Sequence, residues 1–343
     1  MKFKFYCTIL IFFMIPGCCL FYESPPLARQ DQKQNDICQW QQSVNTKLTK
    51  DDIALDKTFS QFKENIAIDH DYLLCSTDNT KQKPPVILLH EINGVEEKTI
   101  AYAKDLANDF TVYVPRLIGD RDTGNSSITG WWSYNFNCEW KQKQELNGSM
   151  LVTQWLRKFI KTVVQKNHDG KHIGIIGNCL TGALPLALLD NSQVTGVVLA
   201  QPTLPIALFY DPEDLEISAT EWKNVRARIN PKKIKEEIKS IPAKAYLTRF
   251  AFDSKSDIKK YEFLVRELSP NQNCNHSSST EQNLLCNQVK SNEYRYKDSN
   301  DKEYKNIDHC AHSVLIGEWQ DDKNHPSQIR RDEVRKFLRN LNN

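Results

Sequence analysis

The sequence lacks a surplus of either charge, and it lacks the motifs by which many proteins hold nucleotides. Its 343 residues include 45 Lys and Arg and 43 Asp and Glu, which gives a net charge of +2. This balance excludes the strongly basic surface that nucleic-acid-binding proteins use. Neither a Walker loop nor a Gly-x-Gly-x-x-Gly fingerprint occurs. We therefore expect a globular protein without a nucleic-acid partner, and the sequence implies no metal or organic cofactor.

Residues 1–18 carry the features of an export signal. Two lysines precede an apolar run that is too short to span a bilayer. The run ends in Ile15-Pro16-Gly17-Cys18, which is similar to a bacterial lipobox, although Pro16 departs from that pattern. The sequence allows two outcomes. Lipidation of Cys18 would hold the protein at a membrane of the periplasm or cell envelope, and plain secretory cleavage would release it.

Residues 59–343 show the alternation of an α/β domain, after a polar tether and N-terminal segment over residues 19–58. Short apolar runs predict buried strands, with helices between them. The expected strands cover 64–68, 72–75, 86–89, 110–114, 173–176, 194–200 and 245–251, and the expected helices 97–108, 150–165, 211–240, 257–268 and 328–341. The polar segment 271–300 contains two cysteines and predicts a disulfide-stabilised surface insertion. This order predicts a mostly parallel sheet flanked by helices, with a site at the carboxyl ends of the strands.

Ten cysteines are many for a cytosolic enzyme but suit an exported one. Three lie in or beside the N-terminal signal, and six of the remaining seven could form three disulfides. Cys38–Cys75 and Cys274–Cys286 are the favoured pairs, although the sequence does not fix the connectivity. We leave Cys179 unpaired, because its turn holds it at the end of a strand.

Cys179 lies in Gly177-Asn178-Cys179-Leu180-Thr181-Gly182, between an apolar run and a helix-like stretch. A strand, a Gly-flanked turn and a helix, with a thiol at the apex, form the layout of a nucleophile elbow. A helix N-terminus beside the sulfur favours a thiolate. Most free cysteines are inert core residues, so the choice between a nucleophile and a core residue depends on the rest of the chain.

A thiol nucleophile needs a base, and the base needs an orienting acid. Asp253 follows the strand expected at 245–251, and His312 lies before the last helix, so both fall in turns after Cys179 in the order nucleophile, acid, base. Asp257 and His309 are alternatives. Asp257 fits the N-cap of the following helix better, and His309 falls in or beside a strand, so Asp253 and His312 are favoured.

An oxyanion hole needs two backbone N–H donors near the nucleophile. Leu180 directly follows Cys179, and Ile92 lies in the loop after the strand at 86–89, so these two residues are the candidate donors. Glu91 in the same loop must find a partner, because a carboxylate at the end of a buried strand is costly to leave alone. The carboxylate of Glu91 could accept a hydrogen bond from the thiol, pair with a cation, or lie exposed to water.

Four motifs in this order resemble those of the dienelactone hydrolase family, a branch of the α/β-hydrolase superfamily. They are His90-Glu91-Ile92-Asn93-Gly94, Val114-Pro115-Arg116-Leu117-Ile118-Gly119, the elbow around Cys179, and Cys310-Ala311-His312-Ser313. The resemblance covers roughly residues 60–340. It implies an α/β-hydrolase fold, a Cys179-Asp253-His312 triad, and a Glu91 that holds the resting thiol neutral until substrate arrives.

Three features depart from the family pattern. Thr181 takes the place of a Gly, which predicts crowding at the elbow. Ile316 stands where the family has a carboxylate-binding Arg, so an acidic dienelactone is a poor candidate substrate. The Trp131-Trp132 pair is atypical, and lining an apolar pocket, exposure and core packing are all open to it.

Two functions remain. The first is an exported hydrolase of esters, lactones or thioesters that acts through an acyl-enzyme on Cys179. The second is a non-catalytic envelope binding protein that retains the fold. A Cys179–Cys310 disulfide would favour the second function, since it would remove the nucleophile, whereas a free thiol at Cys179 would favour the first.

Overall fold

The structure is a computed structural model that describes most of the domain and does not describe residues 1–36. The described residues are 37–48, 66–77, 82–121, 126–142, 148–204, 211, 213–229, 242–250, 253–268, 284–289, 296–297, 303–304, 311–319, 323 and 325–342. The signal and lipobox expected at residues 1–18 therefore lie outside the described residues, as do Cys274, His309 and Cys310. Among the described residues, no helix is both long enough and apolar enough to cross a membrane.

Eight strands of the described chain form one mixed sheet. The strands are β1 (Cys38–Leu48), β2 (Ile66–Cys75), β3 (Pro85–Leu88), β4 (Thr111–Pro115), β5 (Ile173–Asn178), β6 (Val194–Ala200), β7 (Lys244–Phe250) and β8 (Leu284–Val289). Their order across the sheet is β1-β2-β4-β3-β5-β6-β7-β8. The six strands from β4 to β8 pair in parallel, whereas β1 and β2 pair antiparallel. The expected mostly parallel α/β sheet is confirmed.

The central strands are apolar along their whole length because helices cover both faces of the sheet. Every residue of β3, β5 and β6 is buried. Each fully buried Val, Leu or Ile contributes about 1.5–3 kcal/mol relative to an exposed position. These strands therefore form the packed centre of the sheet, and they fix the positions at which the loops at their carboxyl ends begin.

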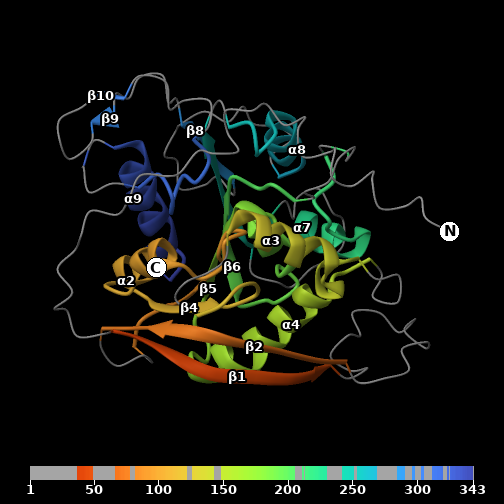
Figure 1. The fold of residues 1–343 in the computed structure, drawn as a ribbon. Coiled ribbons are helices and arrows are strands. Elements are labelled where there is room, and N and C mark those ends of the chain that lie inside the picture. Colours follow the sequence, from red (N-terminus) through yellow and green to blue (C-terminus); the bar gives the residue numbers. More distant parts are fainter. Residues whose placement is uncertain are drawn as a thin grey trace, which may run out of the picture.

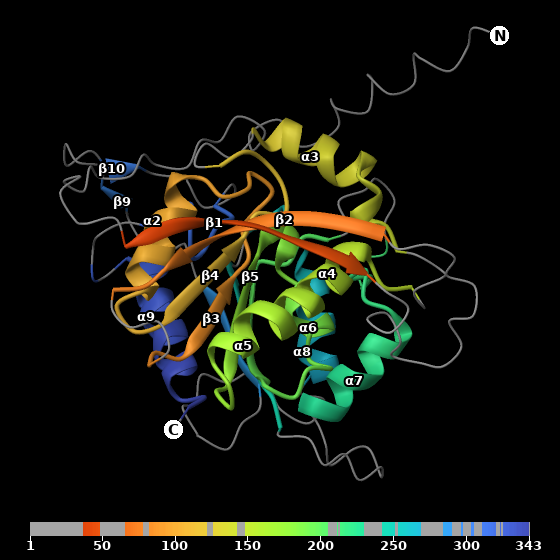
Figure 2. The ribbon, with the colours of Figure 1, turned by 90° about the horizontal axis from the view of Figure 1, so that it is seen from below.

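Two layers of helices cover the sheet, one on each face. One hydrophobic cluster contains side chains of α4 (Leu151–Phe159), α7 (Ala219–Ile229) and α8 (Ile258–Leu268), and the second contains those of α2 (Glu97–Leu106) and α9 (Pro326–Arg339). Figure 1 shows α2 and α9 on one side of the sheet and α4, α7 and α8 on the other. Figure 2 shows β1 and β2 crossing the molecule at the edge of the sheet beyond β4.

The sheet extends beyond the strands expected from the sequence at both edges. β1 lies in the segment expected to be a tether and N-terminal segment, so the fold begins before residue 59. β8 lies in the segment 271–300, which was expected to be a surface insertion, yet it pairs in parallel with β7. The two short strands expected at 64–68 and 72–75 are a single strand, β2.

The disulfide Cys38–Cys75 closes the end of the β1–β2 ribbon, as the sequence predicted. The two cysteines are directly paired in register across the ribbon, and both are buried. A covalent link at this point ties the N-terminal strand to the sheet and stabilises the fold by constraining the unfolded chain.

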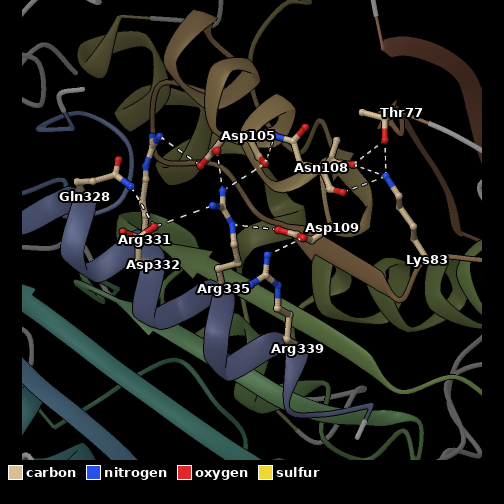
Figure 3. Close-up of polar contacts among 11 residues, drawn as sticks. Thr77, Lys83, Asp105, Asn108, Asp109, Gln328, Arg331, Asp332, Arg335 and Arg339 are labelled. Carbon is tan, nitrogen blue, oxygen red and sulfur yellow. Dashed lines mark hydrogen bonds and ion pairs between the residues drawn. The ribbon is translucent and has the colours of Figure 1, made fainter. Parts of the chain in front are cut away.

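A charged network holds α9 against α2 (Figure 3). Arg335 donates to Asp105 at 2.6 Å and pairs with Asp109 at 3.2 Å, and Arg339 donates to Asp109 at 2.6 Å. Arg331 is buried, stacks over the Tyr102 ring and donates through Nε to the carbonyl oxygen of Leu315 at 2.7 Å. Burial lowers the pKa of Arg331 to about 10. Because Leu315 follows His312 closely, α9 fixes the loop that carries this histidine.

Candidate active site

Cys179 lies at the turn where β5 ends, between the loops that follow β3 and β6. Its φ is 52°, in the left-handed region that residues with a Cβ rarely adopt, and only 6% of the residue is exposed. Gly177 lets the turn close, because a Cβ there would lie 2.4 Å from the carbonyl oxygen of Thr181. A 3-10 turn over Cys179–Thr181 leads into the short helix α6 (Leu184–Ala187). A strained turn with a thiol at its apex is the geometry of a nucleophile elbow.

Thr181 supports this turn. Its Oγ1 donates to the carbonyl oxygen of His90 at 2.9 Å and accepts from the Asn178 N–H at 3.0 Å. The Asn178 side chain donates to the carbonyl oxygen of Leu89 at 2.9 Å. All of these groups are buried. The expected crowding by Thr181 is therefore wrong, because its hydroxyl takes a place in the hydrogen bonds that join the turn after β5 to the end of β3.

The structure brings His312 and Asp253 together. Asp253 Oδ2 lies 2.7 Å from His312 Nδ1, and both residues are buried. The other oxygen, Oδ1, accepts the backbone N–H groups of Lys255 and Ser256 at 2.9 and 3.0 Å. Arg249 donates to the carbonyl oxygen of Asp253 at 2.8 Å. The carboxylate is therefore fixed by its own loop and points one oxygen at the imidazole.

The electrostatics of His312 reflect both Asp253 and Cys179. Burial alone would lower the pKa of His312, but the Asp253 carboxylate and the Cys179 sulfur raise it well above its usual value. The effect of Cys179 shows that its sulfur lies within electrostatic reach of the ring. His312 Nε2 nevertheless makes no hydrogen bond of normal geometry within the described chain. The ring is thus oriented by Asp253 through Nδ1 and presents Nε2 to the site, as a general base must.

Ile92 and Leu180, the candidate oxyanion donors, lie in the loops that follow β3 and β5. Leu180 occupies the turn directly after the sulfur, and Ile92 lies in the loop after β3. The helix α3 (Ser127–Phe136) packs on this second loop at Gly130, where a Cβ would lie 2.1 Å from the carbonyl oxygen of Ile92. Because only a glycine allows this approach, α3 fixes the path of the Ile92 loop.

Glu91 is buried beside the site, and its described contacts are with two other loops. Oε1 accepts from the Gln201 side chain at 3.0 Å and from the Ser313 hydroxyl at 2.6 Å. Gln201 follows β6 directly, and Ser313 follows His312. The carboxylate therefore connects the loop after β3 with the loop that carries the histidine. No described contact joins Glu91 to the sulfur of Cys179.

His90, next to Glu91, is a structural residue. Its ring is fully buried, with Nε2 accepting the backbone N–H groups of Leu117 and Ile118 at 2.9 and 3.3 Å. Burial lowers the pKa of His90 to about 4, so the ring is neutral and able to accept these bonds. It joins the loop after β3 to the loop after β4.

The remaining residues named from the sequence have clear positions. Asp257 immediately precedes α8 and accepts the N–H of Lys259 at 2.9 Å, the position of a helix cap. Ile316 is buried in the core with the residues of α9. Trp132 is 46% exposed and stacks on Phe136, so this member of the tryptophan pair faces outward from α3.

In the described part of the chain, no group of three or more His, Cys, Asp and Glu side chains is arranged to hold a metal ion. His168 and His172 have the spacing of a metal motif but lie in a turn, not on one helix face. His168 Nε2 lies 3.1 Å from the Tyr113 hydroxyl.

Sequence reasoning missed the loop after β6. Thr203 Oγ1 lies 3.5 Å from Cys179 Sγ, and the Thr203 N–H donates to the carbonyl oxygen of Cys179 at 3.1 Å. Gln201 binds Glu91, and the carbonyl oxygen of Pro202 accepts the Ser256 hydroxyl at 2.9 Å. One signal was present, because these residues directly follow the strand beside β5, and the carboxyl ends of neighbouring parallel strands meet at one edge of a sheet.

Comparisons with known proteins agree with this fold. A sequence profile described as the dienelactone hydrolase family matches residues 71–245, just over half of the 343 residues. No curated protein matches the sequence at a significant level. A solved dienelactone hydrolase-like promiscuous phosphotriesterase from metagenomic libraries is 13% identical, with a TM-score of 0.50, and the match covers 89% of this chain and 99% of that one.

An esterase from Pyrococcus furiosus is also 13% identical, with a TM-score of 0.46, and the match covers 93% of this chain and 100% of that one. At such identities the structural likeness concerns the fold, whereas the profile match runs from the second half of β2 to the start of β7 and includes the elbow. This chain therefore belongs to the dienelactone hydrolase family of carboxylic ester hydrolases.

Proposed function

We propose that this protein cleaves an ester, lactone or thioester through an acyl-enzyme formed on Cys179, with His312 as the base and Asp253 as the residue that orients it. One observation carries the proposal. The free thiol of Cys179, at positive φ at the carboxyl end of β5, lies within electrostatic reach of His312, and His312 Nδ1 is hydrogen-bonded to the buried carboxylate of Asp253.

The chemistry follows from these positions. His312 Nε2 takes the proton of the thiol, and the sulfur attacks the carbonyl carbon of the substrate. Asp253 stabilises the imidazolium and holds the ring so that Nε2 faces the sulfur. When the tetrahedral intermediate collapses, the carbon–oxygen bond of an ester or lactone, or the carbon–sulfur bond of a thioester, breaks, and His312 returns the proton to the alcohol or thiol group that is released. Water, activated by the same nitrogen, then hydrolyses the thioester and releases the acid.

Backbone N–H groups stabilise the negative oxygen of the tetrahedral intermediate in this proposal. Leu180 and Ile92 supply them, one from the loop after β5 and one from the loop after β3. Each such donor contributes about 10²–10³-fold to kcat in hydrolases. The close packing of α3 on the Ile92 loop supports this assignment, because an oxyanion donor acts only when its position is fixed.

The substrate class differs from that of a dienelactone hydrolase in one respect. Ile316, at the position expected for the carboxylate-binding Arg, is an apolar residue with 1% exposure. It offers no charge to a substrate carboxylate. We therefore expect neutral esters, lactones or thioesters to be preferred over acidic dienelactones.

A panel of chromogenic esters, thioesters and lactones with short acyl chains tests this function. Wild-type protein should turn over at least one neutral member, and Cys179→Ala and His312→Ala should both lose that turnover. Asp257→Asn is the matched control, because Asp257 caps α8 and Asn caps helices as well as Asp does. Turnover that survives in Cys179→Ala would overturn the proposal.

The alternative, a binding protein without catalysis, is less favoured. It would be favoured by a disulfide that consumes Cys179, whereas Cys179 is free in the structure. A protein that binds a neutral ester without hydrolysing it, with an unreactive Cys179, would restore this alternative.

We also propose that the protein is exported. The apolar N-terminal run supports this, as does the Cys38–Cys75 disulfide, because disulfides persist in oxidising compartments. Membrane fractionation of a bacterium expressing the full chain, with and without Cys18→Ala, tests the two modes of export. Loss of membrane association in the variant indicates lipidation, an unchanged soluble exported protein indicates plain cleavage, and cytoplasmic retention of the wild type contradicts export.

A further inference from the structure

Cys179 is the only free cysteine among the described residues, and the one hydrogen bond of normal geometry that they give its side chain is with Thr203. The sulfur lies 3.5 Å from Thr203 Oγ1, within the range of a hydrogen bond to sulfur. Glu91, which the family resemblance assigns to the resting thiol, is instead bonded to Gln201 and Ser313. His312 Nε2 has no hydrogen-bond partner of normal geometry in the described chain. The sulfur therefore has a hydroxyl beside it where the resemblance assigns a carboxylate, in addition to the His312 ring, whose pKa Cys179 raises.

The direction of this hydrogen bond follows from the surroundings of Thr203. The residue is 7% exposed, and the sulfur is the one hydrogen-bond partner of its hydroxyl among the described residues. A buried hydroxyl proton needs an acceptor, and Cys179 Sγ is the acceptor that the described residues offer. Donation to sulfur stabilises the thiolate more than the thiol, because hydrogen bonds to charged groups are the stronger ones.

Thr203 also fixes the backbone of the nucleophile. Its N–H donates to the carbonyl oxygen of Cys179 at 3.1 Å, so one residue holds both the main chain and the side chain of the cysteine. The loop is itself anchored, since Gln201 N–H donates to the carbonyl oxygen of Thr248 at 2.8 Å and Lys260 Nζ donates to that of Leu204 at 2.6 Å. The hydroxyl is therefore presented to the sulfur from a fixed support.

We propose that Thr203 is a positioning residue of this hydrolase: its hydroxyl donates to Cys179 Sγ and stabilises the thiolate that forms when His312 takes the proton of the thiol. The inference rests on the proposed function of Cys179 as nucleophile. It adds that the reactive sulfur is supported from the loop after β6 and not from the loop after β3.

The test measures alkylation of the Cys179 peptide by iodoacetamide from pH 5 to pH 10 in the full-length folded protein. In Thr203→Val the backbone bond to Cys179 remains and the hydroxyl is lost. The pH of half-maximal alkylation should rise by about one unit, the size expected when a hydrogen bond to a charged group is lost. Thr203→Ser, which restores a hydroxyl, should return the curve to that of the wild type.

Two further variants distinguish the effect of the Thr203 hydroxyl from that of other buried side chains. Thr248→Val is the matched control, because Thr248 is also buried and its hydroxyl makes no hydrogen bond within the described chain, so its curve should match the wild type. Glu91→Gln should also leave the curve unchanged. An unshifted curve in Thr203→Val, or a shift in Glu91→Gln alone, would overturn the inference. If Thr203→Val fails to fold, Thr203→Ala removes the same hydroxyl and takes its place.

Ester turnover is read separately on the same variants. A Thr203-dependent alkylation curve in a protein without turnover would leave the inference standing and remove the proposed function. Turnover that depends on Cys179, together with an alkylation curve that is the same in wild type and Thr203→Val, would leave the proposed function standing and overturn the inference.

Discussion

Asp253 Oδ2 lies 2.7 Å from His312 Nδ1, although 59 residues separate the two in the sequence. The pair joins the loop after β7 to the loop before α9. Each partner is held by further contacts, since Asp253 accepts two N–H groups of its own loop and Arg331 binds the loop of His312. This pairing joins two distant turns within electrostatic reach of Cys179.

Replacing Asp253 by Asn should leave the fold intact and remove most activity. The amide cannot balance an imidazolium, and its NH2 favours the wrong tautomer of His312, so kcat should fall by about 10³–10⁴-fold. Steady-state hydrolysis of the best ester in the panel measures this. Equal losses in Asp253→Asn and the control Asp257→Asn would contradict the role of Asp253.

The pH dependence of stability should carry the signature of His312. Its pKa is higher in the folded protein than in the unfolded chain, so its contribution is fully present below about pH 6.5, the unfolded value. The contribution is lost as the pH rises through the higher folded value. Urea unfolding of wild type and His312→Gln across this range should give a stability difference that shrinks with rising pH. A difference that grows with pH would contradict the assignment.

Thr181→Val should destabilise the protein and slow catalysis together. The change leaves the buried Asn178 N–H and His90 carbonyl without a partner, at a cost of about 1–3 kcal/mol. Thr195→Val is the comparison, because the Thr195 hydroxyl is buried without a hydrogen bond in the described structure, and its removal should be nearly neutral. Denaturant midpoints and kcat are the measurements, and equal midpoints for the two variants would refute the role of Thr181.

Gly130→Ala should lower kcat, and the loss of transition-state stabilisation should exceed the loss in the free energy of unfolding. The added Cβ meets the carbonyl oxygen of Ile92, so the Ile92 loop or α3 must shift. A shift of about 1 Å in a catalytic group costs up to about 10²-fold in rate. Ser133→Ala changes the same helix without touching the loop and should retain full activity. Normal kcat in Gly130→Ala would argue against Ile92 as an oxyanion donor.

Arg331 and Arg339 both lie on α9 but should differ in their importance. Arg331→Met leaves the carbonyl oxygen of Leu315 unpaired in the core, which costs about 1–3 kcal/mol. Arg339→Met breaks an exposed ion pair with Asp109, worth about 0–1 kcal/mol. Thermal unfolding of the two variants measures this contrast, and equal shifts would show that the Leu315 contact does not matter.

The central strands could be predicted from the sequence because strands that are buried on both faces consist of continuous runs of apolar residues. The strand expected at 194–200 is β6 with the same limits, and the turn around Cys179 follows from Gly177 and the apolar strand before it. The pairing of Cys38 with Cys75 was also predicted correctly.

The edges of the sheet were harder to predict, since edge strands are partly exposed and rich in polar residues. β1 carries Cys38 and Trp40 in alternation with polar residues, a pattern of period two that identifies a half-buried strand, but its overall polarity suggested a tether. β8 was missed because its segment is polar on both sides.

The contacts of Thr203 and Gln201 could not be read from the sequence, because they depend on how loops from separate strands meet. A lone Thr or Gln after a strand carries no chemical signature of its own. Its role appears only when the register of β5 and β6 sets the carboxyl ends of both strands side by side.

The most direct test of Cys179 as nucleophile is the capture of its acyl-enzyme. Wild-type protein is mixed with the best chromogenic thioester or ester, quenched in acid within milliseconds to seconds, digested and analysed by mass spectrometry. The acyl group should appear on the Cys179 peptide at the same rate as the first product is released. In His312→Ala the acylated Cys179 peptide should accumulate only if the substitution slows hydrolysis of the acyl-enzyme more than it slows its formation. Full turnover with no acyl group on Cys179, or with the acyl group on another residue, would contradict the proposed mechanism.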